Sequence, residues 1–415
     1  MSASTETLTT DPPPIVPPNP EPQGAGLGAL LSGRLRQVGI FLALIAIVIL
    51  FQVLTGGTLL TPRNVSSIVG QNAYVLILAI GMVMIIIAGH IDLSVGSVVA
   101  FVGAISGIFI VNWGWPWWIG VIAAVLVGGL IGAWQGFWIA YVGIPAFIVT
   151  LAGMLTFRGL TQMVLQNVPI TPFPDSYVAI GSGYLPDLGG GTSAFEPLTL
   201  VLGILATIGL VGTQVRERAK RVKLGLEDEP RSWFLAQAIF TAVFILAITF
   251  TLASYRGTPI VLVILAALIL IYTAVMNQFV FGRHIYARGG NLHAAQLSGV
   301  DTKKVDFALF VNMGLLAGIA GIAFTARSNS ALPGAGTGFE LDAIAAAFIG
   351  GAAVTGGIGT VTGAIIGGLI MGVLNNGMSL LGLGTEVQSF IKGFVLLLAV
   401  AFDIFNKRRA ANASK

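Results

Sequence analysis

The chain contains a long series of apolar segments, each about as long as a lipid bilayer is thick. A helix needs about 20 mostly apolar residues to cross the hydrocarbon core. We expect crossings at 38–54, 66–88, 94–111, 117–140, 144–165, 195–213, 233–252, 258–281, 306–326, 341–354, 360–381 and 386–405. Segment 341–354 is short and 94–111 closely follows its predecessor, so a half-helix or re-entrant piece is an alternative for each. The sequence predicts an all-α, polytopic integral membrane protein of about 10–12 transmembrane helices.

The composition excludes a soluble protein. Only 9% of the residues are charged, whereas soluble domains carry about 25%. The 55 Gly are typical of helices that pack closely in a bilayer. The formal charge of +4 is scattered between apolar segments, which argues against a nucleic-acid site. There is no Cys, which excludes disulfides and thiolate chemistry.

The basic residues predict the orientation. With all twelve segments crossing and the N-terminus cytoplasmic, sixteen Lys and Arg lie inside: Arg34, Arg36, Arg216, Arg218, Lys220, Arg221, Lys223, Arg231, Arg283, Arg288, Lys303, Lys304, Lys407, Arg408, Arg409 and Lys415. Three lie outside, namely Arg63, Arg256 and Arg327, and Arg158 and Lys392 fall within apolar segments, where snorkelling is the default. This excess predicts cytoplasmic termini.

The chain divides into two tails and one membrane domain. Residues 1–35 are mostly polar and Pro-rich at the start, and predict a disordered cytoplasmic tail. The transmembrane domain is expected over 36–409 and a short cytoplasmic tail over 410–415.

Glycines recur at helical spacing and near two interruptions. Gly128, Gly132 and Gly136 follow one another at intervals of four, which predicts close helix packing; a helix that slides during transport is the alternative. Stretches 85–107 and 347–368 each join an apolar run to a polar, Gly-containing turn and a new small-residue helix. Paired interruptions of this kind indicate a substrate path at the interface of a repeated unit.

Acidic residues lie near the ends of the apolar segments, and not at mid-helix positions where they could form a proton or ion relay. Asp92, with Ser94 and Gly96, is expected to cap a helix start, and an ion or proton site is the alternative. We expect no metal site, bound cofactor or catalytic residue, because His90, His284 and His293 do not cluster and no nucleotide-binding motif occurs. If the chain is a transporter, this pattern of acidic residues disfavours ion coupling through its own ionisable groups and favours an energy source outside the chain.

The polar stretch 282–304 interrupts the apolar segments. Asn291 is a good N-cap and Gly299 a good helix stop, so a helix of two turns is expected on the cytoplasmic side. We expect it to dock a cytoplasmic motor, with Leu292, Ala295 and Leu297 and the neighbouring Ala294 entering the partner's groove; lying on lipid headgroups is the alternative. The full docking set is Asn291, Leu292, His293, Ala294, Ala295, Gln296, Leu297, Ser298 and Gly299.

Three stretches together resemble a known family: GHIDLSVGS, FGRHIYARGGNLHAAQLSGV and AAFIGGAAVTGGIGTVTGAIIGGLIMGVLNNGM. They are similar to ribose- and xylose-type permease subunits of bacterial sugar-importing ABC transporters, within the group that includes branched-chain amino-acid permeases. The resemblance covers about 36–409. The added helices and cytoplasmic loop at 195–255 are similar to the xylose-type branch.

The resemblance implies a multi-pass subunit of the bacterial inner membrane, paired with a second copy of itself. Its other partners would be membrane lipid, a periplasmic sugar-binding protein and a cytoplasmic ATPase with two nucleotide cassettes, which holds ATP and Mg. The docking helix lies where this family contacts its ATPase. Xylose, or several aldoses, would cross by alternating access. We expect polar residues on apolar helices to line the path: Gln71, Asn72, Gln135, Asn312, Asn375 and Asn376. Hydrogen bonds between helices are the alternative for each.

Three other functions stay open at this point. One is a self-sufficient secondary transporter or channel for small polar solutes, which the scarcity of mid-helix acids disfavours. Another is an ABC permease for branched-chain amino acids, whose charged substrate should call for more ionic groups. The third is a membrane scaffold or sensor, which the interrupted Gly-rich segments disfavour.

Overall fold

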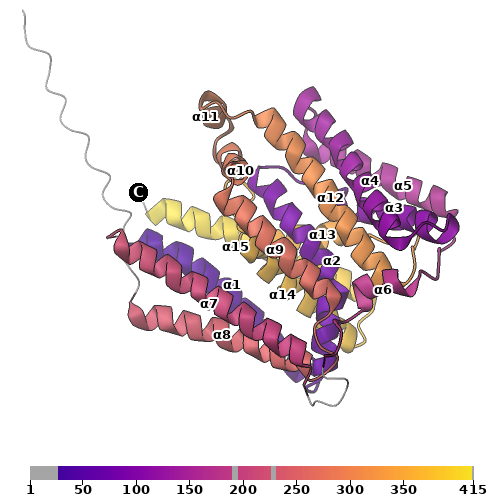
Figure 1. Cartoon of the computed structure of the whole chain (residues 1–415). Helices are drawn as coiled ribbons and strands as arrows, with labels where there is room; N and C mark the ends of the chain where they lie inside the picture. Colours follow the sequence, from indigo (N-terminus) through magenta and orange to yellow (C-terminus); the bar gives the residue numbers. More distant parts are fainter. Residues whose placement is uncertain (1–26, 189–194, 226–229, 414–415) are drawn as a thin grey trace, which may run out of the picture.

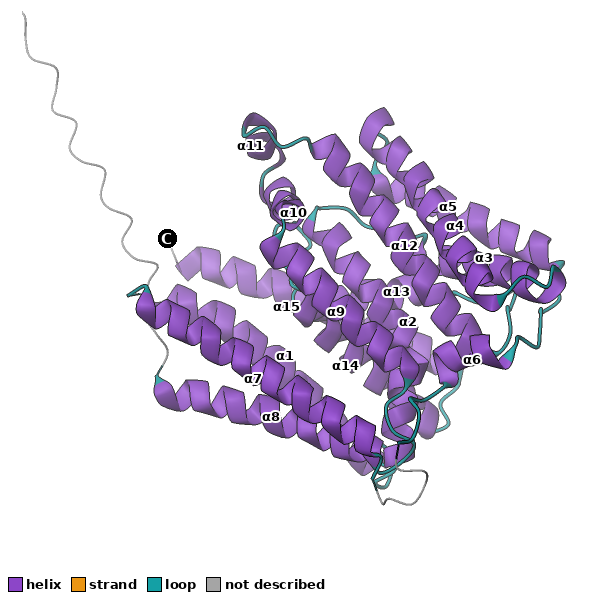
Figure 2. Cartoon of the chain, in the orientation of Figure 1, coloured by secondary structure: helices purple, strands orange, loops and turns teal. Residues whose placement is uncertain are grey.

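The computed structural model describes residues 27–188, 195–225 and 230–413. These residues fold as helices joined by loops (Figure 2), with isolated β-bridges at Ile170–Ala331 and Tyr184–Pro259. Nine helices within the described ranges are long and apolar enough to cross a membrane. The chain is therefore a multi-pass, all-helical membrane protein.

The first half of the chain contributes α1 (Leu27–Leu54), α2 (Pro62–Ile87), α3 (Val95–Gly107), η1 (Ile108–Asn112), α4 (Trp117–Phe137), η2 (Trp138–Val142), α5 (Ala146–Leu165), α6 (Asp175–Ser182) and α7 (Pro197–Lys223). The second half contributes α8 (Arg231–Ala253), α9 (Ile260–Gln278), α10 (Val280–Gly290), α11 (Leu292–Leu297), α12 (Thr302–Ser328), α13 (Phe339–Ile349), α14 (Val361–Leu380) and α15 (Thr385–Ala413). The short π-helical segments η1 and η2 continue α3 and α4.

Each of the twelve expected segments corresponds to a helix, but the shortest falls below the length of a crossing. Helix α13 has 11 residues, a rise of about 17 Å, against a hydrocarbon core of about 30 Å. Helix α3 reaches 18 residues only together with η1. Two boundaries need correction: α1 begins at Leu27 and α15 continues to Ala413, so parts of both expected tails are helical. Helix α1 can start early because 27–35 contain no Pro, while residues 1–26 lie outside the described part.

Helices α2 and α12 form the centre of the bundle. The most apolar part of α2 is 89% buried, and α12 packs against α2, α3 and α4. The hairpin of α7 and α8 lies at one side (Figure 1) and keeps most of its apolar side chains exposed, as expected of a surface that faces lipid. Figure 1 shows α11, the start of α1 and the end of α15 toward one end of the bundle and α6 toward the other.

Glycines allow α4 and α12 to pack backbone to backbone. A Cβ at Gly132 would clash with the Phe310 carbonyl oxygen, and one at Gly128 would clash with that of Gly314. Conversely, a Cβ at Gly318 would lie 3.0 Å from the Val125 Cα. The expected close packing of the glycine-spaced helix is therefore confirmed at this crossing.

The two interruptions expected from the sequence lie against each other. The first break follows α2, where Gly89 has a φ of +83°, and the second follows α13 and contains Gly357 at +74°. Such backbone conformations favour glycine, which explains its presence in both turns. The Gly357 N–H donates to the Ile87 carbonyl at 2.8 Å, so the breaks are joined directly although about 270 residues separate them in the chain.

Candidate functional site: a polar cavity between α2, α13, α14 and α15

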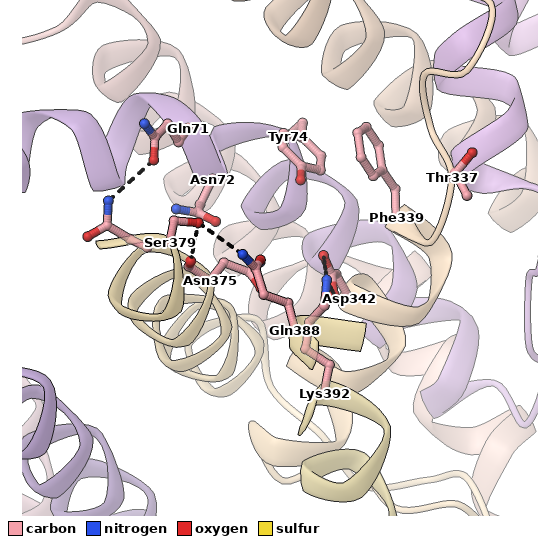
Figure 3. A pocket seen from close by; sticks show the side chains of 11 residues that line it. Gln71, Asn72, Tyr74, Thr337, Phe339, Asp342, Asn375, Ser379, Gln388 and Lys392 are labelled. Carbon is pink, nitrogen blue, oxygen red and sulfur yellow. Dashed lines mark hydrogen bonds and ion pairs between the residues drawn. The ribbon is translucent and has the colours of Figure 1, made fainter. Parts of the chain in front are cut away.

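A polar cavity of ≈ 210 Å³ lies among four helices that the chain brings together from its two ends. It is lined by Gln71, Asn72, Tyr74, Thr337, Phe339, Asp342, Asn375, Asn376, Ser379, Gln388 and Lys392 (Figure 3). The residues come from the first half of α2, the start of α13 and the turn before it, the second half of α14 and the first part of α15. A set of amide, hydroxyl and charged groups in such an apolar chain indicates a site for a polar ligand.

Side-chain amides form a network on one wall of the cavity. Asn376 accepts a hydrogen bond from Asn64 Nδ2 at 2.8 Å and donates to Gln71 Oε1 at 3.3 Å. Asn72 donates to the Ile68 carbonyl at 2.9 Å, which fixes the orientation of its amide. Asn375 Oδ1 is buried and has no hydrogen-bond partner among the described residues, so this oxygen is free to accept a hydrogen bond from a ligand.

An ion pair lies on the opposite wall. Lys392 Nζ is 3.0 Å from Asp342 Oδ1 and 3.2 Å from Oδ2 (Figure 3). Snorkelling of Lys392 was therefore the wrong expectation, since its ammonium group finds a carboxylate on α13. The pair joins α15 to α13, and Gln388 donates to Ser379 at 3.3 Å to join α15 to α14.

Two aromatic rings border the same space. Tyr74 and Phe339 stack with their ring centroids 4.0 Å apart and their planes at 29°. The cavity thus combines an apolar aromatic wall, several amide donors and acceptors, and one ion pair with no net charge. Such a surface suits an uncharged ligand rich in hydroxyl groups, because each hydroxyl can both donate and accept a hydrogen bond.

Four of the six polar residues expected along the path lie in this cavity: Gln71, Asn72, Asn375 and Asn376. The other two lie elsewhere and join helices. Gln135 is buried and contacts Ser94 Oγ at 2.9 Å, and Asn312 accepts a hydrogen bond from Tyr272. For these two amides, hydrogen bonding between helices is the interpretation that the geometry supports.

Seven lining residues had not been identified from the sequence, namely Tyr74, Thr337, Phe339, Asp342, Ser379, Gln388 and Lys392. The only signal for any of them was Lys392, a cation inside an apolar segment with no partner nearby in the chain. Its carboxylate is 50 residues away. A cation inside an apolar segment therefore predicts an acidic partner that is distant in the chain.

Asp92 stabilises the turn before α3 through Ser94. Its Oδ1 accepts hydrogen bonds from the Ser94 backbone N–H at 2.8 Å and from Ser94 Oγ at 2.6 Å. The carboxylate therefore orders the residue that precedes Val95, the first residue of α3, and does not bond the first helical turn itself. Next in the chain, Gly96 lies so close to Gly336 that a Cβ there would clash with the Gly336 carbonyl oxygen.

Burial raises the pKa of Asp92 to about 6, which predicts a pH-dependent stability. Because the folded-state pKa lies above the unfolded value, the carboxyl favours folding below about pH 4, and this contribution is lost as the pH rises through 6. Asp92→Asn keeps the Oδ1 acceptor without a charge. We expect it to raise the melting temperature in detergent at pH 8, with a gain on the order of 2–3 kcal/mol. The gain in melting temperature should vanish near pH 4. A lower melting temperature of Asp92→Asn at pH 8 would contradict the raised pKa of Asp92.

The short helix α11 presents some of the expected docking residues outward and others inward. Asn291 Oδ1 accepts from the Ala294 N–H at 3.0 Å, and Gly299 ends the helix with a φ of +85°. Leu297 is 90% exposed, whereas Ala295 is 5% exposed and packs inside the chain. The expectation that Ala295 inserts into a partner is therefore corrected. Helix α11 has only six residues and packs against α10 and α12, so one of its faces, with Ala295, is covered by these two helices.

Comparison with known proteins identifies relatives along nearly the whole chain. The family described as branched-chain amino acid transport system / permease component matches residues 64–400. The xylose transport system permease protein XylH of Escherichia coli (strain K12) is 40% identical over 389 residues, which cover 94% of this chain and 97% of that protein. The XylH protein of Haemophilus influenzae is 41% identical over 374 residues, which cover 90% and 97%.

The ribose import permease protein RbsC of Escherichia coli (strain K12) is 33% identical over 370 residues, which cover 88% of this chain and 94% of RbsC. No solved structure matches the chain. The relatives are transport components, and the polar cavity lies within the matched region, so the chain is a transport subunit and not an enzyme. The chain belongs to the branched-chain amino acid transport system / permease component family.

Proposed function

We propose that this chain is the permease subunit of an ATP-driven monosaccharide importer of the bacterial inner membrane, with xylose as its substrate. Its similarity to xylose permeases over 94% of its length is the observation that carries the proposal. The neutral, amide-lined cavity supports a sugar over an amino acid, because the ammonium and carboxylate groups of an amino acid would each need an opposite charge that is not already paired.

The cavity is proposed to be a sugar site on the translocation path, in the outer half of the membrane. Its residues lie in the halves of α2 and α14 that are farther from α10, since Ile87 at the other end of α2 lies against Gly289. Helices α10 and α11 are taken to be cytoplasmic, together with both termini, because this orientation gives the cytoplasm the excess of basic residues.

The subunit is proposed to act as a homodimer with three further partners. A periplasmic sugar-binding protein delivers the sugar, and a cytoplasmic ATPase with two nucleotide cassettes holds ATP and Mg and docks on α11. Lipid surrounds the exposed helices. The ATPase drives alternating access, so the cavity opens first to the periplasm and then to the cytoplasm.

Uptake of labelled xylose, arabinose, galactose and ribose by cells that lack only this chain tests the proposal. Xylose uptake should fall to background and return when the chain is expressed from a plasmid. Unchanged uptake of all four sugars would contradict a role in sugar import. Purified chain that concentrated xylose in liposomes without an ATPase would instead indicate a secondary transporter.

Breaking the ion pair in the cavity should impair transport more than removing both charges. Asp342→Asn or Lys392→Met leaves one charge unpaired at a site where the Asp342 side chain is only 5% exposed, and loss of one partner of a buried pair costs about 3–5 kcal/mol. We expect each single variant to lower the initial rate of xylose uptake at least about tenfold, and the double variant to recover part of it. Rates are normalised to the amount of protein in the membrane.

The exposed ion pair of Lys304 and Asp301 provides the control. Its atoms lie 3.1 Å apart, but the two side chains are 78% and 50% exposed, so Lys304→Met should change uptake less than about twofold. Equal effects of Lys304→Met and Lys392→Met would show that a lost surface charge, and not the cavity, explains the result.

A further inference from the structure

Helix α10 contacts both helix interruptions and immediately precedes α11. Three residues in its last two turns make these contacts: Tyr286, Arg288 and Gly289. Tyr286 OH donates to the Gly359 carbonyl at 2.8 Å, just before α14 begins. Arg288 donates to the Ala88 carbonyl, just after α2 ends. One short helix is thus bonded to the inner ends of two of the helices that line the polar cavity.

Gly289 brings α10 into backbone contact with both breaks. A Cβ at this position would clash with the Ile87 carbonyl oxygen and would lie 2.8 Å from the Gly357 nitrogen. The adjacent Gly290 differs completely, because nothing lies within 4 Å of the position of its Cβ. Only the first of the two glycines is therefore required by the packing.

An ion cluster binds α10 to the start of α12, on the other side of α11. Arg288 Nε lies 2.8 Å from Asp306 Oδ1, and Arg288 Nη2 donates to Asp306 Oδ2 at 3.0 Å. The His90 ring, in the first break, lies 3.2 Å from the same carboxylate and 2.8 Å from Arg288 Nη2. The Arg288 and Asp306 side chains are only 13% and 11% exposed, so solvent screens this pair weakly.

Space beside α11 would allow this unit to move. A cavity of ≈ 560 Å³ separates Leu292 and Gln296 of α11 from the segment of η2 and α5 between Ile139 and Phe147. Arg288, His90 and Asp306 also line it. A displacement of α11 toward α5 would therefore meet open volume before it met packed side chains.

We propose that α10 is the transmission element of this permease: it carries the displacement of α11 to the inner ends of α2 and α14, which move the polar cavity in their outer halves. Each helix spans about 20 Å between its contact with α10 and the cavity, and a helix transmits such a displacement as a rigid rod. Arg288 and Asp306 act as positioning residues that make α10, α11 and the start of α12 move together. The inference rests on the proposed function, because it assumes that the ATPase docks on α11.

Paired substitutions test the proposal in the complete complex, reconstituted in liposomes with its ATPase and binding protein. Gly289→Ala forces α10 away from both breaks, and Gly290→Ala is its matched control. Asp306→Asn breaks the buried ion pair without a change of shape. Its control is Asp301→Asn, the same substitution at an exposed helix cap in the same loop. The measured quantity is the number of ATP molecules hydrolysed per xylose transported.

We expect Gly289→Ala and Asp306→Asn to keep the ATPase bound and hydrolysing while ATP consumed per xylose rises at least about tenfold. The two controls should stay within about twofold of the unchanged protein. A merely structural role would lower complex yield, hydrolysis and transport together, and that result, or an unchanged ratio in both variants, would overturn the proposal. Absence of ATP-driven xylose uptake by the unchanged complex would overturn the proposed function as well.

Discussion

Leu297→Asp is expected to release the ATPase subunit from the membrane while this chain stays folded. Leu297 is 90% exposed on α11, so its replacement disturbs no internal packing. Most of the energy of a small docking surface comes from a few residues, each of which contributes about 2 kcal/mol or more, and Leu297 is the apolar side chain that α11 exposes most. Placing a carboxylate there should weaken ATPase binding by about 100-fold or more and abolish xylose uptake. Co-purification of the ATPase with tagged permease measures the first effect directly.

Leu224→Asp is the matched control for this experiment. Leu224 follows α7 and is 64% exposed, so the same apolar-to-acidic change occurs at a comparably accessible site away from α11. It should leave ATPase binding unchanged. If Leu297→Asp retained the ATPase, α11 would not be the docking element. Ala295→Asp is the less informative variant, because Ala295 is buried and a carboxylate there would disturb α11 itself.

Gly132→Val is expected to produce a large loss of stability. A side chain at this position must displace the backbone of α12 at Phe310, since no flexible side-chain end can move aside. Overpacking of a tight interior commonly costs 1–3 kcal/mol, and a backbone clash lies at or beyond the upper end. We expect about 3 kcal/mol or more, seen as a fall of at least about 6 °C in the melting temperature in detergent.

Gly212→Val on α7 controls for the helical propensity of valine. Nothing lies within 4 Å of a Cβ at Gly212, so only the small propensity difference between valine and glycine remains, which is below about 1 kcal/mol. Similar melting temperatures for the two variants would show that α4 and α12 separate easily. That outcome would favour the alternative in which these helices slide during transport.

The fold was largely predictable because long apolar runs leave the backbone few alternatives in a membrane. Segments such as 258–281 correspond closely to α9 (Ile260–Gln278), since a helix satisfies its own hydrogen bonds. Exact ends were harder. The start of α1 at Leu27 lies before the apolar run that predicted the crossing, in a stretch where Gly, Ser and Arg interrupt the apolar residues, so hydropathy did not mark it.

The cavity was only half predictable. Amides on apolar helices stand out in a sequence, but Asn375 at the cavity and Asn312 at a helix contact look alike until the neighbours are known. Tyr74 and Phe339 are indistinguishable from packing aromatics. The partner of Lys392 depends on how α15 packs against α13, which no local pattern encodes.

The pairing of Asp342 with Lys392 has an electrical consequence. Among the residues that the structure describes, these two are the only charged side chains that line the cavity, and their charges cancel. When the cavity binds an uncharged sugar and reorients, no net charge moves through the electric field of the membrane. Moving one unpaired charge across the whole membrane would change the free energy by about 2.3 kcal/mol per 100 mV. The step in which the loaded cavity reorients should therefore depend little on membrane voltage, as long as Asp342 and Lys392 stay paired.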